Sequence, residues 1–131
     1  MSLRFAGYAA LFGKRDAGRD TIRKGAFART IATRRDPLAL YWQHRPEQRI
    51  GWIEYVGEDQ RGLRVIASID NEDGVASAAL RSGKTTGLSF GYRTLGGRTT
   101  NEGRELYDVE LLEISLVTHP MQHGARVHLL R

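Results

Sequence analysis

The chain contains no cysteine, which excludes disulfides, thiolate metal sites and cysteine nucleophiles. It also has no apolar run approaching the ~20 residues of a membrane-spanning helix. The first residues do not form an apolar signal core, because Arg4, Lys14 and Arg15 bracket a short alternating segment. We therefore expect a protein that works in the cytosol, or in a compartment assembled from it, and that does not bind a membrane.

Proline is scarce, with 3 residues, whereas the 15 glycines suit a chain with many tight turns. A length of 131 residues fits a single domain, expected over residues 1–131. The 20 lysines and arginines exceed the 15 acidic residues and give a net charge of +5, but they form no long block. A basic surface can hold nucleic acid or an acidic partner. Because the charge is dispersed, the sequence favours a solvated basic face.

Most of the chain is predicted to be β-structure, because alternating or aromatic-rich segments recur between turn residues. Strands are expected at residues 3–12, 38–43, 50–58, 63–69, 85–95, 104–118 and 126–130. Short helices are expected at residues 24–33 and 71–83, and turns or loops at 13–20, 45–48, 59–62 and 96–103. Hairpin connections dominate, so we predict a mainly β fold with a few short helices. It should be a mostly antiparallel sheet of about seven strands, closed or half-closed into a barrel.

One serine lies between two glycines, in the segment Gly87-Leu88-Ser89-Phe90-Gly91. The segment matches the G-x-S-x-G pattern, which in α/β-hydrolases marks a turn between a strand and a helix. Here the following residues continue as a strand, and the chain is too short for the parallel sheet of that fold. Ser89 is therefore interpreted as a strand-borne serine, which is either a small residue on a crowded sheet or a nucleophile.

A serine hydroxyl is a weak nucleophile unless a base takes its proton, and imidazole is suited to that task near neutral pH. His44 ends an aromatic strand, where its ring can lie at a sheet edge. Glu113 is an acid within an otherwise apolar run, and a buried carboxylate needs a cationic or hydrogen-bonding partner. That partner is either an imidazole or one of the many arginines. We predict that Ser89, His44 and Glu113 meet as nucleophile, base and orienting acid.

Strand geometry adds a candidate for stabilising an oxyanion. Side chains two residues apart on a strand point the same way, so Ser89, Gly91 and Arg93 should share a face. The glycine would leave room for a substrate backbone, and Arg93 or nearby backbone N–H groups could stabilise a developing negative charge.

Several motifs in a fixed order resemble the prohead proteases of tailed phages. They begin with Phe5-Ala6-Gly7-Tyr8-Ala9, Gly25-Ala26-Phe27 and Trp42-Gln43-His44. They continue with Ile50-Gly51, Arg61-Gly62-Leu63, the segment from Gly87 to Tyr92, and Leu112-Glu113-Ile114-Ser115-Leu116-Val117-Thr118 with Pro120. The likeness runs from about Phe5 to Val127. It implies a serine endopeptidase related in fold to the herpesvirus assembly proteases.

The resemblance further implies Ser89 as nucleophile, His44 as base and Glu113 as the acidic third member. It implies hydrolysis of a scaffold protein, or of the scaffold-like N-terminal region of the major capsid protein precursor, inside an immature capsid in the host cytoplasm. The source would be a bacteriophage, a prophage or a gene-transfer particle, and self-association would follow from the related viral proteases. No metal or organic cofactor is expected.

Two features of the sequence depart from the family pattern. The residue before Pro120 is His119, where the family usually has an apolar or aromatic residue. Herpesvirus proteases use a second histidine as third member, so His119 is an alternative to Glu113. The chain also ends soon after its last predicted strand, whereas relatives often carry a C-terminal region that could direct them into the capsid.

A non-enzymatic alternative is a basic β-barrel that binds nucleic acid or capsid and scaffold proteins. The residues Tyr41, Trp42, Trp52 and Tyr55 would then form a stacking platform beside surface arginines. Under that alternative, replacement of Ser89 would be neutral and affinity for nucleic acid would fall steeply with salt. A further alternative is an inactive scaffold partner that keeps the fold for assembly. The joint presence of Ser89, His44 and Glu113 favours the protease, and nucleic acid is not the expected partner.

Overall fold

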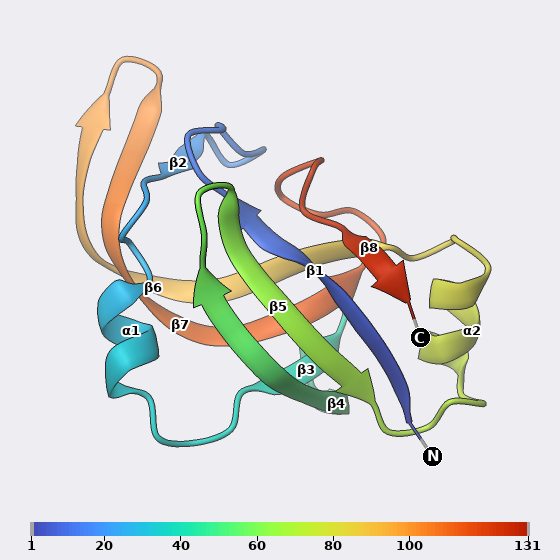
Figure 1. Ribbon diagram of the computed structural model, residues 1–131. Helices are drawn as coiled ribbons and strands as arrows, with labels where there is room; N and C mark the ends of the chain where they lie inside the picture. Colours follow the sequence, from blue (N-terminus) through green and yellow to red (C-terminus); the bar gives the residue numbers. More distant parts are fainter. Residues whose placement is uncertain (1, 131) are drawn as a thin grey trace.

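The computed structural model describes residues 2–130, which form eight strands and two short helices (Figure 1). The strands are β1 (Leu3–Leu11), β2 (Asp20–Ile22), β3 (Ala39–Trp42), β4 (Arg45–Glu58), β5 (Gly62–Ile69), β6 (Gly87–Thr100), β7 (Gly103–Val117) and β8 (Val127–Leu130). The helices are α1 (Ala28–Thr33) and α2 (Val75–Arg81). Neither of these helices, six and seven residues long, has the length of a membrane span.

All eight strands belong to one sheet. One edge of β7 pairs with β6 and the other edge with both β2 and β3, after which the order continues through β4, β5, β1 and β8. The β2–β7 and β3–β7 pairs are parallel, and the remaining strand pairs are antiparallel. The prediction of a mostly antiparallel sheet is confirmed, although the sheet is mixed.

The sheet curls because the segment before β8 contacts both β1 and β6. The Tyr8 N–H donates to the Arg126 carbonyl at 3.2 Å, and the Leu88 N–H donates to the Ala125 carbonyl at 2.8 Å. The Val127 N–H in turn donates to the Thr86 carbonyl at 2.9 Å. The result is the half-closed barrel that the sequence predicts, with β1 crossing its middle (Figure 1).

The core fills the inside of this curl with aliphatic side chains and two phenylalanines, Phe5 and Phe27. The largest fully buried side chains are Ile22, Phe27, Leu40, Leu63, Val65, Ile69, Leu88, Leu106, Val109, Leu111, Ile114 and Leu116. Each such side chain contributes about 1.5–3 kcal/mol through removal from water. This core gives β6 and β7 one apolar face and leaves the opposite face for polar side chains.

A β-bulge in β7 explains why its second half is apolar at both odd and even positions. Gly91 pairs with Glu113 and Tyr92 pairs with Leu111, so Leu112 is an extra residue without a partner on β6. Leu112 is 50% exposed. Just before the bulge Val109 and Leu111 face the core, and after it Ile114 and Leu116 do. Glu113 is thereby placed on the face away from the core.

The structure differs from the prediction at the β6–β7 hairpin. Residues 96–103 were expected to form a loop, but the strands continue to Thr100 and resume at Gly103, forming an arm that projects beyond the barrel (Figure 1). Cross-strand ion pairs hold the arm, including Arg98 with Glu105 at 3.0 Å. The additional strand is β2, which was not predicted, since the expected loop ended at Asp20 and the two residues after it were assigned to no element.

The other elements lie near their predicted places. The β4–β5 hairpin is present, and its turn is closed by the Asp59 carboxylate, which accepts hydrogen bonds from the N–H groups of Arg61 and Gly62 at 2.8 and 3.1 Å. Helix α2 ends before Gly83, whose φ of +80° is the left-handed conformation that glycine adopts readily.

Candidate active site

Ser89 lies on the face of β6 that points away from the core. Its neighbours Leu88 and Phe90 pack into the core, so the alternation of the strand turns Ser89 outward. Opposite Ser89 on β7 is Ser115. Ser89 is 3% exposed. Within residues 2–130 its hydroxyl has no hydrogen-bond partner, and none of the fully buried polar side-chain atoms there is unpaired. The remaining exposed area of Ser89 therefore includes its oxygen.

His44 lies in a tight turn between β3 and β4, where Trp42 pairs directly with Arg45. Gln43 and His44 have φ angles of +54° and +61°, the pattern of a type I′ turn. This conformation costs roughly 1–3 kcal/mol for each non-glycine residue. The sequence prediction was wrong here, since it placed the turn at Arg45–Gln48 and continued the strand to Gln43.

Contacts with the end of β7 hold this strained turn. The Gln43 side chain donates to the Thr118 hydroxyl at 2.8 Å and accepts from the Thr118 N–H at 3.1 Å. The Gln43 N–H donates to the Leu116 carbonyl at 3.0 Å. The His44 N–H donates to the Ser115 hydroxyl at 3.1 Å. The turn is therefore set by β7, the strand that also carries Glu113.

The His44 ring contacts the Glu113 carboxylate. Nδ1 of His44 lies 2.6 Å from Oε1 of Glu113. This hydrogen bond raises the pKa of His44 above its ordinary value, although partial burial of the ring opposes the change. A carboxylate at Nδ1 also selects the tautomer that leaves Nε2 unprotonated in the neutral ring. Nε2 can then accept a proton from a neighbouring hydroxyl.

Gly91 provides the space that the Glu113 carboxylate occupies. A Cβ atom at position 91 would lie 2.5 Å from Oε1 of Glu113, well inside contact distance. The sequence prediction had assigned this space to a substrate backbone. In the structure the glycine instead permits the acid to lie across β6 toward His44.

The two remaining candidates lie apart from this contact. Arg93 is exposed and forms an ion pair with Glu110, directly opposite on β7. An oxyanion role for Arg93 stays a prediction, and it requires release of Glu110. His119 is exposed in the bend after β7. Because Nδ1 of His44 faces Glu113, the geometry favours Glu113 over His119 as the third member.

Sequence reasoning missed two polar residues near Ser89. Ser115 contacts both His44 and Glu113. The sequence pattern that could have revealed it is a polar residue two positions after Glu113, on the same face of the strand. Arg126 pairs with Gly87, so its side chain leaves the sheet on the same face as Ser89. Its guanidinium donates to the Thr86 hydroxyl at 3.0 Å and to the His123 carbonyl at 2.7 Å.

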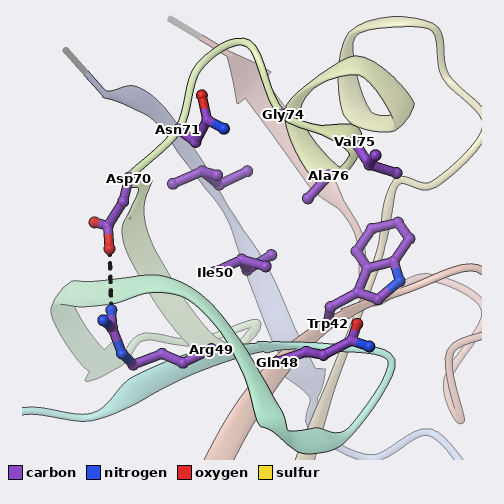
Figure 2. Close-up of a pocket in the computed structure, with 10 residues that line it drawn as sticks. Trp42, Gln48, Arg49, Ile50, Asp70, Asn71, Gly74, Val75 and Ala76 are labelled. Carbon is purple, nitrogen blue, oxygen red and sulfur yellow. Dashed lines mark hydrogen bonds and ion pairs between the residues drawn. The ribbon is translucent and has the colours of Figure 1, made fainter.

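A cleft with a volume of about 420 Å³ opens between the β3–β4 hairpin and the start of α2 (Figure 2). Its apolar walls are Trp42, Ile50, Ile69, Val75 and Ala76. The Arg49–Asp70 ion pair, at 3.0 Å, lies at one side. Ser89, His44 and Glu113 do not line this cleft, so the candidate chemistry lies outside it, on the outer face of the barrel.

The four aromatic residues of the proposed stacking platform do not share one face. Trp42 packs against the core, and its neighbour Tyr41 points to the opposite face of β3. Trp52 and Tyr55 lie exposed on β4, at 39% and 50%. The guanidinium of Arg49 covers the Trp52 ring at 4.5 Å.

Comparison with solved structures shows that this chain has the fold of herpesvirus proteases. The crystal structure of KSHV protease in complex with a hexapeptide phosphonate inhibitor matches with a TM-score of 0.66 and 12% identity, over 97% of this chain and 64% of that one. Varicella-zoster virus protease matches with a TM-score of 0.63 and 14% identity, over 98% of this chain and 64% of that one. The chain thus spans slightly less than two thirds of the length of these enzymes.

The sequence itself matches a family model along its full length. Residues 1–131 match the model described as caudovirus prohead serine protease. The chain belongs to this family of serine proteases, as its motifs predicted. No curated protein sequence matches it significantly.

Proposed function

We propose that this chain is a serine endopeptidase that cleaves a scaffold protein, or the scaffold-like N-terminal region of the major capsid protein precursor, while a phage prohead matures. The observation that carries the proposal is the 2.6 Å contact between His44 Nδ1 and Glu113 Oε1, on a strand that pairs with the one carrying Ser89. Membership of a prohead protease family supports the substrate class. We propose that cleavage takes place inside the immature capsid, in the host cytoplasm, by a self-associating enzyme.

In the proposed mechanism, Nε2 of His44 takes the proton of the Ser89 hydroxyl as Oγ attacks a peptide carbonyl carbon. The tetrahedral intermediate collapses, the C–N bond breaks, and His44 returns the proton to the leaving amine. A water molecule then gives a proton to His44 as its oxygen attacks the acyl-enzyme. His44 passes that proton to Oγ of Ser89 as the ester C–O bond breaks and the new carboxyl terminus leaves. Glu113 holds the imidazole in position and stabilises its charged form.

The test uses the capsid protein encoded beside this chain. The two proteins are co-expressed, and the intact mass of the capsid protein is measured with the wild-type enzyme and with Ser89→Ala. We expect one N-terminal truncation with the wild type and its loss, by about 1000-fold or more in rate, with Ser89→Ala.

Ser77→Ala is the matched control, because Ser77 is also a buried serine but bonds the Asn71 carbonyl at the start of α2. It should leave the truncation intact. An unchanged capsid-protein mass with wild type and Ser89→Ala alike, in assembled capsids, would contradict the processing role and favour the binding module.

A further inference from the structure

Ser115 lies between the strands that carry the candidate nucleophile and the candidate base. On one side it pairs with Ser89 of β6, and on the other with Tyr41 of β3, three residues before His44. Its side chain is fully buried. A single residue therefore borders both halves of the site.

The Ser115 hydroxyl uses its donor and an acceptor position for two different members of the site. It donates to Oε2 of Glu113 at 2.7 Å, while Oε1 of the same carboxylate faces His44. It also accepts the His44 backbone N–H at 3.1 Å. A hydroxyl has one donor and two acceptor lone pairs, so both bonds form at once.

These two bonds restrict the two motions that would separate His44 from Glu113. Rotation of the carboxylate is opposed because its second oxygen is held. Relaxation of the left-handed turn is opposed because its N–H is held. A serine that only filled space would bond a nearby main-chain carbonyl, as Ser77 does with Asn71 at 2.7 Å.

We propose that Ser115 is a positioning residue that fixes the backbone of the base and the carboxylate of the acid relative to each other. This inference rests on the proposed function, since it assigns Ser115 to the activation of Ser89 through His44. It adds a fourth side chain to the site, one that does not touch the reacting atoms.

The first readout of the test is the labelling rate of Ser89 by a fluorophosphonate. Oγ of Ser89 attacks phosphorus, an O–P bond forms, the P–F bond breaks, and the hydroxyl proton leaves through His44 as fluoride departs. The intact mass of the full chain gives the rate at each pH. We expect Ser115→Ala to be slower by about 10- to 100-fold, and Ser115→Thr, which keeps the hydroxyl, to recover most of the rate.

The second readout is the pKa of His44, measured by NMR titration. With Ser115→Ala the carboxylate and the turn are released, so this pKa should fall toward its ordinary value, and the acid limb of the labelling profile should move with it. Ser77→Ala, a matched loss of a buried hydroxyl, should match the wild type in both readouts.

The two readouts separate the inference from the proposed function. If the pKa of His44 and the pH profile of Ser115→Ala equal those of the wild type, the positioning role is wrong. If the wild-type chain is never labelled at Ser89, the proposed nucleophile is wrong, and the NMR comparison still tests Ser115. If Ser77→Ala shifts the pKa of His44 as much as Ser115→Ala, the effect is general loosening and the inference is overturned.

Discussion

Two carboxylates near the β6–β7 hairpin each bond a cationic partner, Asp20 of β2 beside the projecting arm and Glu113 of β7 at the barrel. Beside the arm, Asp20 binds the Arg104 guanidinium through two bonds of 2.9 Å and accepts a hydrogen bond from the Tyr92 hydroxyl. At the barrel, Glu113 binds His44 at 2.6 Å and Ser115 at 2.7 Å. Both carboxylates are held by two side chains.

The clusters differ in which groups titrate. Hydrogen bonds from Arg104 lower the pKa of Asp20, and burial together with Asp20 raises the pKa of Tyr92. Arginine stays protonated in proteins, so the arm cluster keeps its charges throughout the neutral range. The pKa of His44 lies above its ordinary value of about 6.5. The barrel cluster therefore contains a side chain that changes its charge, with a midpoint above about pH 6.5.

The cation thus decides between a structural and a chemical role. A guanidinium clamps the arm to β2, whereas an imidazole held by a carboxylate can accept and return a proton. The burial of a carboxylate in a β-strand therefore does not show whether its role is structural or catalytic, because the cationic partner decides this.

The largest effect should come from Glu113→Gln. The amide no longer favours the tautomer with a free Nε2, so kcat/KM on a peptide that spans the cleavage site should fall by about 100- to 10,000-fold. The pKa of His44 should return toward about 6.5. Because the base acts when neutral, the acid limb of the pH–rate profile should move to lower pH.

His119→Ala is the control for that experiment, since His119 is the competing third member. This substitution should leave both kcat/KM and the acid limb of the pH–rate profile unchanged. A large loss with His119→Ala and a small one with Glu113→Gln would reverse the assignment.

A smaller loss is expected from Gly91→Ala, which leaves every polar group in place. The added Cβ would lie 2.5 Å from Oε1 of Glu113 and must push the carboxylate away from His44. We expect activity to fall by about 10- to 100-fold, with a lower pKa of His44 by NMR.

Gly96→Ala is the matched control on the same strand, because its Cβ would lie 3.4 Å from its nearest neighbour, Cβ of Asp108. It should behave as the wild type. Equal losses for the two variants would show that the effect comes from the strand and not from the acid.

A substitution in the arm cluster should lower the stability of the fold and leave the rate of turnover unchanged. Asp20→Ala leaves Arg104 and Tyr92 without their acceptor and should lower the free energy of unfolding by about 1–3 kcal/mol. Activity per folded molecule should stay unchanged. Glu54→Ala, which removes an exposed ion pair with Arg4, should cost about 0–1 kcal/mol in the same denaturation experiment.

The pH dependence of stability separates the clusters further. Because the pKa of His44 is raised in the folded state, His44 contributes to the free energy of unfolding, and this contribution is fully present below about pH 6.5. That contribution is lost as the pH rises through the folded pKa. The lowered pKa of Asp20 gives a contribution present above about pH 3.9 and lost only in acid. Glu113→Gln should therefore cost more at pH 6 than at pH 9, whereas Asp20→Ala should cost the same at both.

The sequence predicted the parts of the fold that depend on local pattern. The β4–β5 hairpin, the two helices and the half-closed curl follow from alternation and turn residues. His44 and Glu113 were named from chemistry and from motifs, and the structure places them in contact. Their roles and that of Ser89 stay predictions until the variants are measured.

The missed features depend on contacts between distant residues. The Gln43–His44 turn has no glycine or asparagine, and its conformation is held by Leu116, Thr118 and Ser115. The bulge at Leu112 reverses the parity of β7, which a period-2 pattern cannot show. Strand β2 has only three residues, two of them polar, and joins the sheet beside the arm, where Asp20 binds Arg104.

The position of Ser89 on the convex side of the sheet bears on how the enzyme would be controlled. If the substrate peptide lies across this outer face, it contacts the enzyme mainly from one side and gains less binding energy than in a deep cavity, so a dilute encounter is brief. Packing enzyme and substrate into one shell raises their effective concentration, to the millimolar order for tethered partners. Under the proposed function, weak binding would keep cleavage slow in dilute solution and would raise it once enzyme and substrate are enclosed together.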